Sequence, residues 1–320
     1  MADHADGNDI FVYRGGRAPR HVTHVRIDKS VEVIEEHVFD GYEDLVQVET
    51  HDGIRKVEAS AFYGCKLLRG INLKSAVEIS DHAFYCCGNL ESVEFGDKLE
   101  TIGRSAFGLC SSLKRLILPS IITFEAGAFW GCSALTDVDI SERLETIESN
   151  AFLGCECLQR IAIPLKRDLL VYNHLRRNYT QFDGCELLVK VDLVGETHTK
   201  TVASLHMGSW STEMQEEINR INQVLPTIAD EKTDEIQQWM DSVLDKMDHY
   251  KAKHLRYVEE ATTLLELSLW KAKLGAREDN YAEGRTKKAK VDVESARNGK
   301  RITCGADTVI KNVLPFLRLE

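Results

Sequence analysis

The chain contains 320 residues, of which 43% are hydrophobic and 28% are charged, and it carries a formal net charge of −11. This apolar fraction is normal for a folded protein, and the length allows two ordinary domains or one elongated array with an appendage. The negative charge is concentrated in residues 1–200, which contain 22 Lys and Arg against 31 Asp and Glu. Because phosphate binding depends on clustered cations, we expect no nucleic-acid partner.

Residues 1–21 are expected to form a disordered N-terminal lead. They include Asp3, Asp6 and Asp9 and lack the apolar core of a secretory signal peptide. No run of apolar residues approaches the roughly 18–20 that a membrane helix needs, so no membrane partner is expected. Nine cysteines without a secretory signal favour reduced thiols. We therefore expect a cytoplasmic protein.

Residues 22–195 repeat one motif, mostly at intervals of 22 or 23 residues. Each unit has a phenylalanine, then a cysteine, then a leucine, three residues apart. The phenylalanines are Phe39, Phe62, Phe84, Phe107, Phe129, Phe152 and Phe182, and the cysteines are Cys65, Cys87, Cys110, Cys132, Cys155 and Cys185. Tyr42 replaces the cysteine of the first unit, and the last unit has about seven additional residues between Arg167 and Tyr179, expected to form a loop or short helix. Such regularity indicates a tandem repeat fold.

An alternating apolar pair follows each motif, as in Leu116 and Leu118. A period of two indicates a strand with one buried face, so we predict one short strand per coil. A second pair, such as Leu144 and Ile147, is expected to return the chain along the opposite wall. One unit is too short to bury its own apolar side chains, so the coils must stack on one another.

The pattern A-F-x-x-C-x-x-L-x-x-I-x-I-P resembles the BspA-type leucine-rich repeats, over about 170 of the 320 residues. The resemblance implies a leucine-rich-repeat solenoid with one short parallel strand per 22–23-residue coil. The residues after the repeats have helical periodicity, so we expect an α-helical C-terminal region to follow the solenoid. Arrays of this type serve adhesion, receptor, regulatory and scaffold roles, so the resemblance leaves the function open.

The resemblance also implies a concave wall on which the residues flanking the buried strand positions face solvent. The middle column of this wall is acidic, with Ile117 and Ala162 as exposed aliphatic side chains. Exposed strand residues vary without cost to the core, so we predict a partner-binding face there. The alternative is an ordinary solvated sheet with the binding site elsewhere. The predicted face comprises Arg69, Asn72, Glu94, Arg115, Ile117, Asp137, Asp139, Arg160 and Asp192.

Residues 205–275 are expected to be α-helical. Apolar residues with alternating spacings of four and three run from Ile236 to Leu264. That spacing is typical of helices that pair with one another. The apolar face is expected to be covered either by packing of a helical hairpin on the solenoid or by a second copy in a coiled-coil homodimer. Residues 276–300 are predicted to be a polar basic linker, and residues 301–320 an apolar docking tail. The linker contains the basic cluster Arg285, Lys287, Lys288 and Lys290.

The sequence contains no recognisable catalytic, nucleotide-binding or metal-binding motif. We expect the repeated cysteines to pack in the core. Cys304 has no identifiable activating base, so no enzyme activity, cofactor or metal is predicted. The expected function is a non-catalytic scaffold or adaptor that binds a protein or peptide through the concave face. The alternatives are a regulatory protein taken into the nucleus by the basic cluster and a surface or adhesion-type repeat protein.

Overall fold

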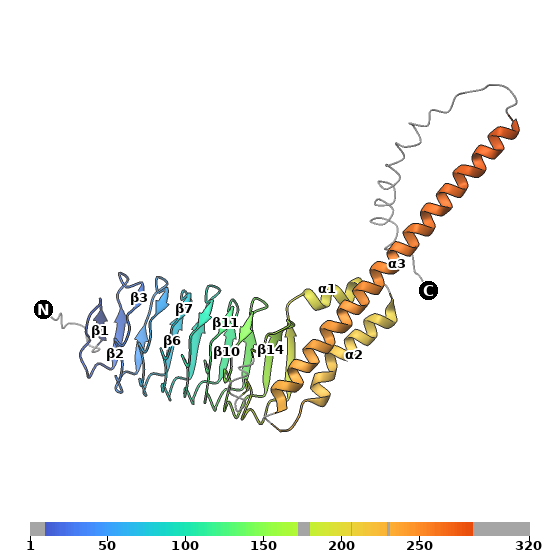
Figure 1. Ribbon diagram of the computed structural model, residues 1–320. Coiled ribbons are helices and arrows are strands. Elements are labelled where there is room, and N and C mark those ends of the chain that lie inside the picture. Colours follow the sequence, from blue (N-terminus) through green and yellow to red (C-terminus); the bar gives the residue numbers. More distant parts are fainter. Residues whose placement is uncertain (1–9, 172–179, 206, 229–230, 284–320) are drawn as a thin grey trace. The chain divides into compact units, whose positions relative to one another are not determined.

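The computed structural model describes residues 10–171, 180–205, 207–228 and 231–283 (Figure 1). The predicted insertion falls largely on residues 172–179, and both the basic cluster and the docking tail fall beyond residue 283, so these predictions lie outside the described residues. The chain divides into two compact units, each described here by itself. The first comprises Met1–His198 and Glu217–Leu244, and the second comprises Thr199–Glu216 and Asp245–Glu320.

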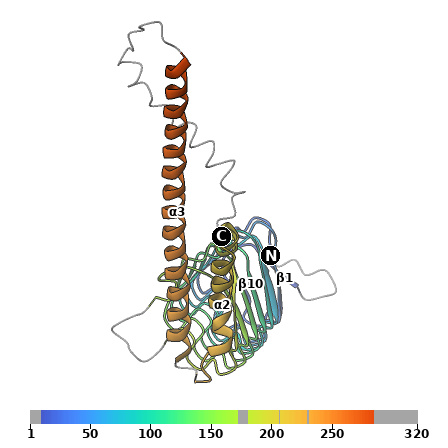
Figure 2. The same cartoon turned by 90° about the vertical axis from the view of Figure 1, so that its right-hand side faces the viewer.

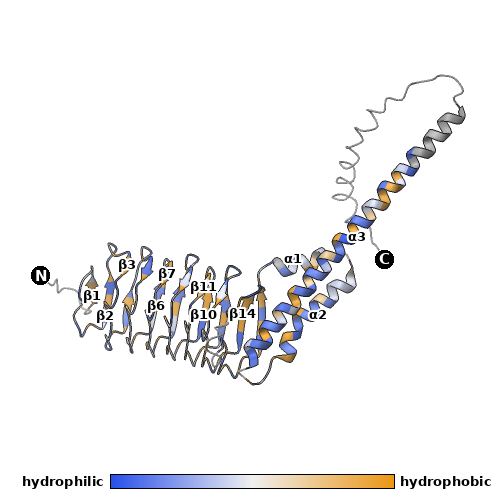
Figure 3. Cartoon of the chain, viewed as in Figure 1, coloured by the Kyte–Doolittle hydropathy of each residue, from blue (hydrophilic) through white to orange (hydrophobic). Residues whose placement is uncertain are grey.

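The first unit contains the predicted solenoid, whose longer strands pair in parallel with their neighbours. Asp139, for example, lies between Ile117 on one strand and Ala162 on the next. In β10 the buried and outward positions alternate, with Leu116 and Leu118 in the core. The strands of the solenoid contain both hydrophilic and hydrophobic residues (Figure 3). The strands are β1 (Ile10–Tyr13), β2 (His24–Ile27), β4 (Gln47–Glu49), β6 (Gly70–Leu73), β8 (Ser92–Phe95), β10 (Arg115–Leu118), β12 (Asp137–Ile140), β14 (Arg160–Pro164) and β15 (Lys190–Val194).

A second sheet forms the opposite wall, so the prediction of one strand per coil was incomplete. The apolar pairs that return the chain themselves pair with the next coil, as Ile102 does with Phe124. All six strands of this sheet are parallel and two residues long. They are β3 (Val33–Ile34), β5 (Lys56–Val57), β7 (Glu78–Ile79), β9 (Thr101–Ile102), β11 (Thr123–Phe124) and β13 (Thr146–Ile147).

The seven repeated phenylalanines form one continuous stack in the core. Each is fully buried, and neighbouring ring centroids lie 5.0–5.8 Å apart with nearly parallel planes. The backbone holds this spacing, because the N–H of Phe62 donates to the carbonyl oxygen of Ala83 on the next coil at 2.8 Å. The predicted core ladder is therefore confirmed, and its stability comes from contacts between coils.

The repeated cysteines also pack in the core, and each has a polar role there. Every Sγ donates to the carbonyl oxygen of the phenylalanine on the preceding coil, at 3.1–3.3 Å. Burial raises the pKa of these thiols, to about 12 in Cys87, Cys132 and Cys185, which keeps them protonated as donors. In the first unit Tyr42 donates instead to the carbonyl oxygen of Ala18 at 2.6 Å.

Residues 10–13 form strand β1, so the prediction of a disordered lead over residues 1–21 is wrong for this segment. β1 pairs in parallel with β2, and the Tyr13 ring is fully buried 5.3 Å from the Phe39 ring. This tyrosine covers the exposed end of the phenylalanine stack. This strand was not predicted because β1 carries none of the repeat motif.

Two helical segments close the other end of the stack (Figures 1 and 2). They are the end of α2 (Gly208–Val224) and the start of α3 (Lys232–Glu283), which belong to the first unit from Glu217 and up to Leu244. Fully buried apolar side chains line this cap: Ile221, Ile236, Trp239, Met240 and Val243. The helices thus pack on the solenoid over these residues, one of the two arrangements that the sequence left open.

Polar side chains of the cap satisfy backbone groups that a further coil would otherwise bind. The side chain of Asn222 accepts from the N–H of Val191 at 2.9 Å, and that of Thr233 accepts from the N–H of Phe182 at 3.2 Å. The buried ammonium of Lys232 donates to three carbonyl oxygens of the last coil, those of Cys185 at 2.8 Å, Glu186 at 2.7 Å and Leu188 at 3.0 Å. Buried backbone groups need such partners.

The second unit is helical and has an aromatic contact at its centre. It includes most of α1 (Thr197–Ser204), the start of α2 and the remainder of α3. Trp210 stacks on Tyr250 at 5.0 Å and on Tyr257 at 5.8 Å. α3 continues to Glu283, so the predicted linker over residues 276–300 is wrong for its first eight residues. Their many charges were interpreted as a linker, although charged residues such as Glu and Arg also favour helices.

Candidate interaction surface

The outward side chains of the longer strands form a surface that we call the strand face. The nine predicted binding residues all lie on these strands except Arg69, which directly precedes β6, and each is exposed or partly exposed. The structure therefore places them as expected. Whether they bind a partner stays a prediction.

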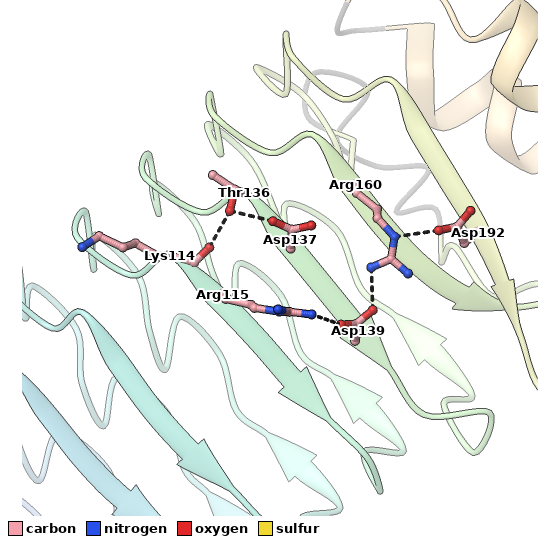
Figure 4. A network of polar contacts seen from close by, with 7 residues as sticks. All are labelled: Lys114, Arg115, Thr136, Asp137, Asp139, Arg160 and Asp192. Atoms are coloured by element: carbon pink, nitrogen blue, oxygen red, sulfur yellow. Dashed lines mark hydrogen bonds and ion pairs between the residues drawn. The ribbon is translucent and has the colours of Figure 1, made fainter.

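Four charged side chains join β10, β12, β14 and β15 on this face (Figure 4). Arg115 lies 3.0 Å from Asp139, which also accepts from Arg160 at 2.6 Å. Arg160 in turn reaches Asp192 at 2.6 Å. The two inner charges, Asp139 and Arg160, are thus each held between oppositely charged groups on the two neighbouring coils. We call Arg115, Asp139, Arg160 and Asp192 the charge chain.

The charge chain explains why Ala162 is buried, against the prediction that it is exposed. Asp139, Ala162 and Asp192 are directly opposite one another on adjacent strands. Because the Arg160 guanidinium contacts both carboxylates, it must lie over the alanine between them, and Ala162 is only 1% exposed. A methyl group leaves room for a guanidinium there, and a longer side chain would displace it.

The contacts of the charge chain favour the charged forms of Asp139 and Arg160. Partial burial alone would raise the pKa of Asp139, but hydrogen bonds from Arg160 and Arg115 hold it below its usual value. The pKa of Arg160 is raised by its bonds to Asp139 and Asp192. The network therefore presents a pre-ordered charge pattern.

Ile117 stands beside this network with 54% of its surface exposed. Asp139, its neighbour on the next strand, forms ion pairs with Arg115 and Arg160. Pro119, two residues after Ile117 in the chain, is also exposed. The strand face thus has an apolar centre next to ordered charges. This combination is typical of the centre and rim of protein-binding sites.

Of the other predicted residues, Asp137 lies on β12 and accepts from the hydroxyl of Thr136 at 2.8 Å, whereas the remaining three form a separate part of the strand face at β6 and β8. Glu94 pairs with Lys74 at 2.8 Å, and the Asn72 side chain accepts from the backbone N–H of Lys74 at 3.0 Å. β6 and β8 form a two-stranded sheet distinct from the sheet that begins at β10. The charge chain does not extend to Arg69, Asn72 and Glu94.

An exposed aromatic cluster on the corner after the phenylalanines escaped the sequence analysis. Tyr63 and Trp130 are each 38% exposed, and Tyr85 lies between them, 5.3 Å from Tyr63 and 6.2 Å from Trp130. Tyr85 reaches across an intervening coil because Gly108 there has no side chain, and a Cβ at that position would lie 2.8 Å from the Tyr85 ring. The sequence does contain a signal for this cluster, since Tyr63, Tyr85 and Trp130 each directly follow one of the repeated phenylalanines.

One cavity in the described part of the first unit has several polar side chains in its lining. A cavity of about 290 Å³ is lined in part by Glu142, Arg143, Lys166 and His198, and burial lowers the pKa of His198. It has no serine, threonine or cysteine in its lining, so it lacks the usual nucleophiles of covalent catalysis.

Among the described residues, no three His, Cys, Asp or Glu side chains are placed to hold a metal ion. No helix within the described ranges combines the length and the apolar character that a membrane span requires.

Comparison with known proteins gives a family and several similar structures. Six copies of the BspA type leucine rich repeat region match residues 19–79 and 77–173. A leucine rich repeat protein of T. pallidum is 31% identical, over 46% of this chain and 68% of that one, with a TM-score of 0.39. A leucine-rich repeat protein from Eubacterium ventriosum is 27% identical, over 43% and 38% of the two chains, with a TM-score of 0.40.

A leucine rich cell surface protein from Faecalibacterium prausnitzii is 21% identical, over 56% of this chain and 62% of that one, with a TM-score of 0.29. No curated protein matches the chain. The matched residues 19–173 contain six of the seven phenylalanines that form the buried stack. Because the family motif coincides with the coils observed in the structure, we conclude that this chain is a member of the BspA type leucine-rich repeat family.

Proposed function

We propose that this protein is a non-catalytic interaction scaffold that binds a protein or peptide through the strand face. The observation that carries the proposal is Ile117, an aliphatic side chain of the ordered strand β10 that is 54% exposed beside the charge chain. A partner that covers it removes apolar surface from water at little entropic cost, because the strand is already ordered.

The charge chain supports the strand face as the binding site and restricts the chemical groups that the partner presents. Arg115 donates one bond to Asp139, yet a guanidinium carries five N–H donors, and the Arg115 side chain is 60% exposed. A carboxylate of the partner is therefore a suitable ligand for Arg115 while an apolar side chain covers Ile117. We propose a segment that presents these two groups side by side.

The test compares the wild type with Ile117→Asp and with Leu67→Asp as a matched control. Leu67 is also an exposed aliphatic residue, 44% exposed, but it lies in a turn and not on a strand. Each full chain is used to capture proteins from its native cells, and the binding of any purified partner is then measured by titration calorimetry.

We expect Ile117→Asp to raise the dissociation constant of the partner at least about tenfold, and Leu67→Asp to leave it unchanged. Equal binding by all three proteins would contradict the proposal. A role in surface adhesion is a variant of the same hypothesis, since it uses the same repeats, and the identity of the captured partner distinguishes it from an intracellular adaptor.

A further inference from the structure

The part of α3 between Glu260 and Lys271 presents apolar side chains to solvent. Leu264 is 65% exposed and Leu267 is 60% exposed, and both lie in the second unit beyond the stacking of Trp210 on Tyr257. Single exposed hydrophobic residues are normal on a protein surface, whereas adjoining ones mark an interaction site. A bare helical segment is also only marginally stable in water.

The four residues Glu260, Leu264, Leu267 and Lys271 form one stripe, which we call the α3 stripe. Their spacings of four, three and four residues place them within a sector of about 60° on the helix, over a length of about 16 Å. Glu260 and Lys271 are both exposed, so the stripe has an acidic end, an apolar middle and a basic end.

This order of residues makes the stripe complementary to itself in one orientation only. In an antiparallel pair, Glu260 faces Lys271 of the second copy and Leu264 faces Leu267 of the second copy. In a parallel pair, glutamate faces glutamate and lysine faces lysine, which is repulsive. We propose that the α3 stripe binds the stripe of a second copy in antiparallel orientation, forming a homodimer.

The dimer extends the role of the protein without depending on the strand face. Two repeat arrays in one assembly bind a multivalent partner with greater avidity than one array does. Failure of strand-face binding would leave the dimer intact, and failure of dimerisation would leave the affinity of each array for a single partner site unchanged.

The first test is sedimentation equilibrium of the full chain over about a hundredfold range of concentration. We expect a reversible monomer–dimer equilibrium in the wild type and a monomer in the double variant Leu264→Glu, Leu267→Glu. The control is Leu255→Glu, since Leu255 is 62% exposed but lies about 150° away around the helix. It should dimerise like the wild type.

A charge exchange then tests the orientation. Glu260→Lys and Lys271→Glu should each raise the dimer dissociation constant at least about fivefold, and the double variant should restore it. An equimolar mixture of the two single variants should form heterodimers. Glu260 also accepts from Arg256 within its own helix at 3.0 Å. This bond is lost in Glu260→Lys and in the double variant alike, so it does not explain a rescue of the first by the second.

Three results would overturn the proposal. The first is a wild type that stays monomeric at all concentrations. The same conclusion would follow if, in addition, the substitutions at Leu264 and Leu267 made residues 284–320 more accessible to protease. The second is a dimer that survives the double leucine variant. The third is a double charge variant that is not rescued, because a parallel pair gains nothing from the exchange.

Discussion

Replacement of Lys232 by methionine tests whether the helical cap satisfies the backbone of the last coil. Lys232 is only 1% exposed, and its ammonium donates to the carbonyl oxygens of Cys185, Glu186 and Leu188. Methionine preserves most of the side-chain volume but donates no hydrogen bond. The change therefore isolates the polar contribution of the side chain from its packing.

The magnitude follows from the burial of the three acceptors. The bonds to Cys185 and Leu188 are buried, whereas the bond to Glu186 is partly buried, so that carbonyl is free to turn to water. Two buried carbonyls without partners cost about 1–3 kcal/mol each. Removal of a buried ammonium offsets part of this, since burial lowers the pKa of Lys232 and thus disfavours its charged form. We expect a net loss of about 2–4 kcal/mol.

The assay is equilibrium urea unfolding followed by tryptophan fluorescence, to which Trp239, fully buried in the cap, contributes as one of four tryptophans. Native-state hydrogen exchange should also show faster exchange at the N–H groups of Val191 and Phe182, which the cap binds. Lys251→Met, at an exposed position of α3, is the control and should change stability by less than about 0.5 kcal/mol. A similarly small loss for Lys232→Met would refute the reasoning.

Three further predictions concern the core ladders. Phe107→Ala, at the middle of the stack, should cost about 3–5 kcal/mol in urea unfolding, and a cost below about 1 kcal/mol would mean that the ring is not tightly packed. In a thiol titration of the native protein, the six ladder cysteines should react far more slowly than the partly exposed Cys86 and Cys157, and equal rates would contradict the buried ladder. Stability should fall as the pH rises above the usual thiol pKa of 9.0, because the ladder thiols ionise only in the unfolded chain. Each contributes up to about 1.4 kcal/mol per pH unit, so Cys110→Ala should reduce the slope of stability against pH.

Periodicity made the solenoid predictable from the sequence. Phenylalanine recurs at the position of Phe107 in all seven units and cysteine at that of Cys110 in six of them, mostly at intervals of 22 or 23 residues, and only a stack of coils buries both columns at once. The outward position of Ile117 followed from the same alternation that placed Leu116 and Leu118 in the core. Each of these statements depends on local spacing, which a sequence displays directly.

The remaining features depend on contacts between distant residues. Lys232 is polar and lies at the start of a helix, and nothing near it in sequence indicates that it binds carbonyls 44–47 residues earlier. Ala162 is buried by the arginine two residues before it, which depends on carboxylates contributed by two other coils. β1 was missed because Tyr13 completes the aromatic stack without belonging to the repeat.

The helical cap on the last coil also limits the end-to-end association of one molecule with another. A stack of parallel coils ends in unpaired N–H and C=O groups, and such an edge is a template for another chain. Asn222, Thr233 and Lys232 occupy several of these groups on the last coil. The array is thereby protected at this edge against end-to-end addition of further molecules. A chain that lost these three side chains would present an adhesive edge, from which filaments are able to form.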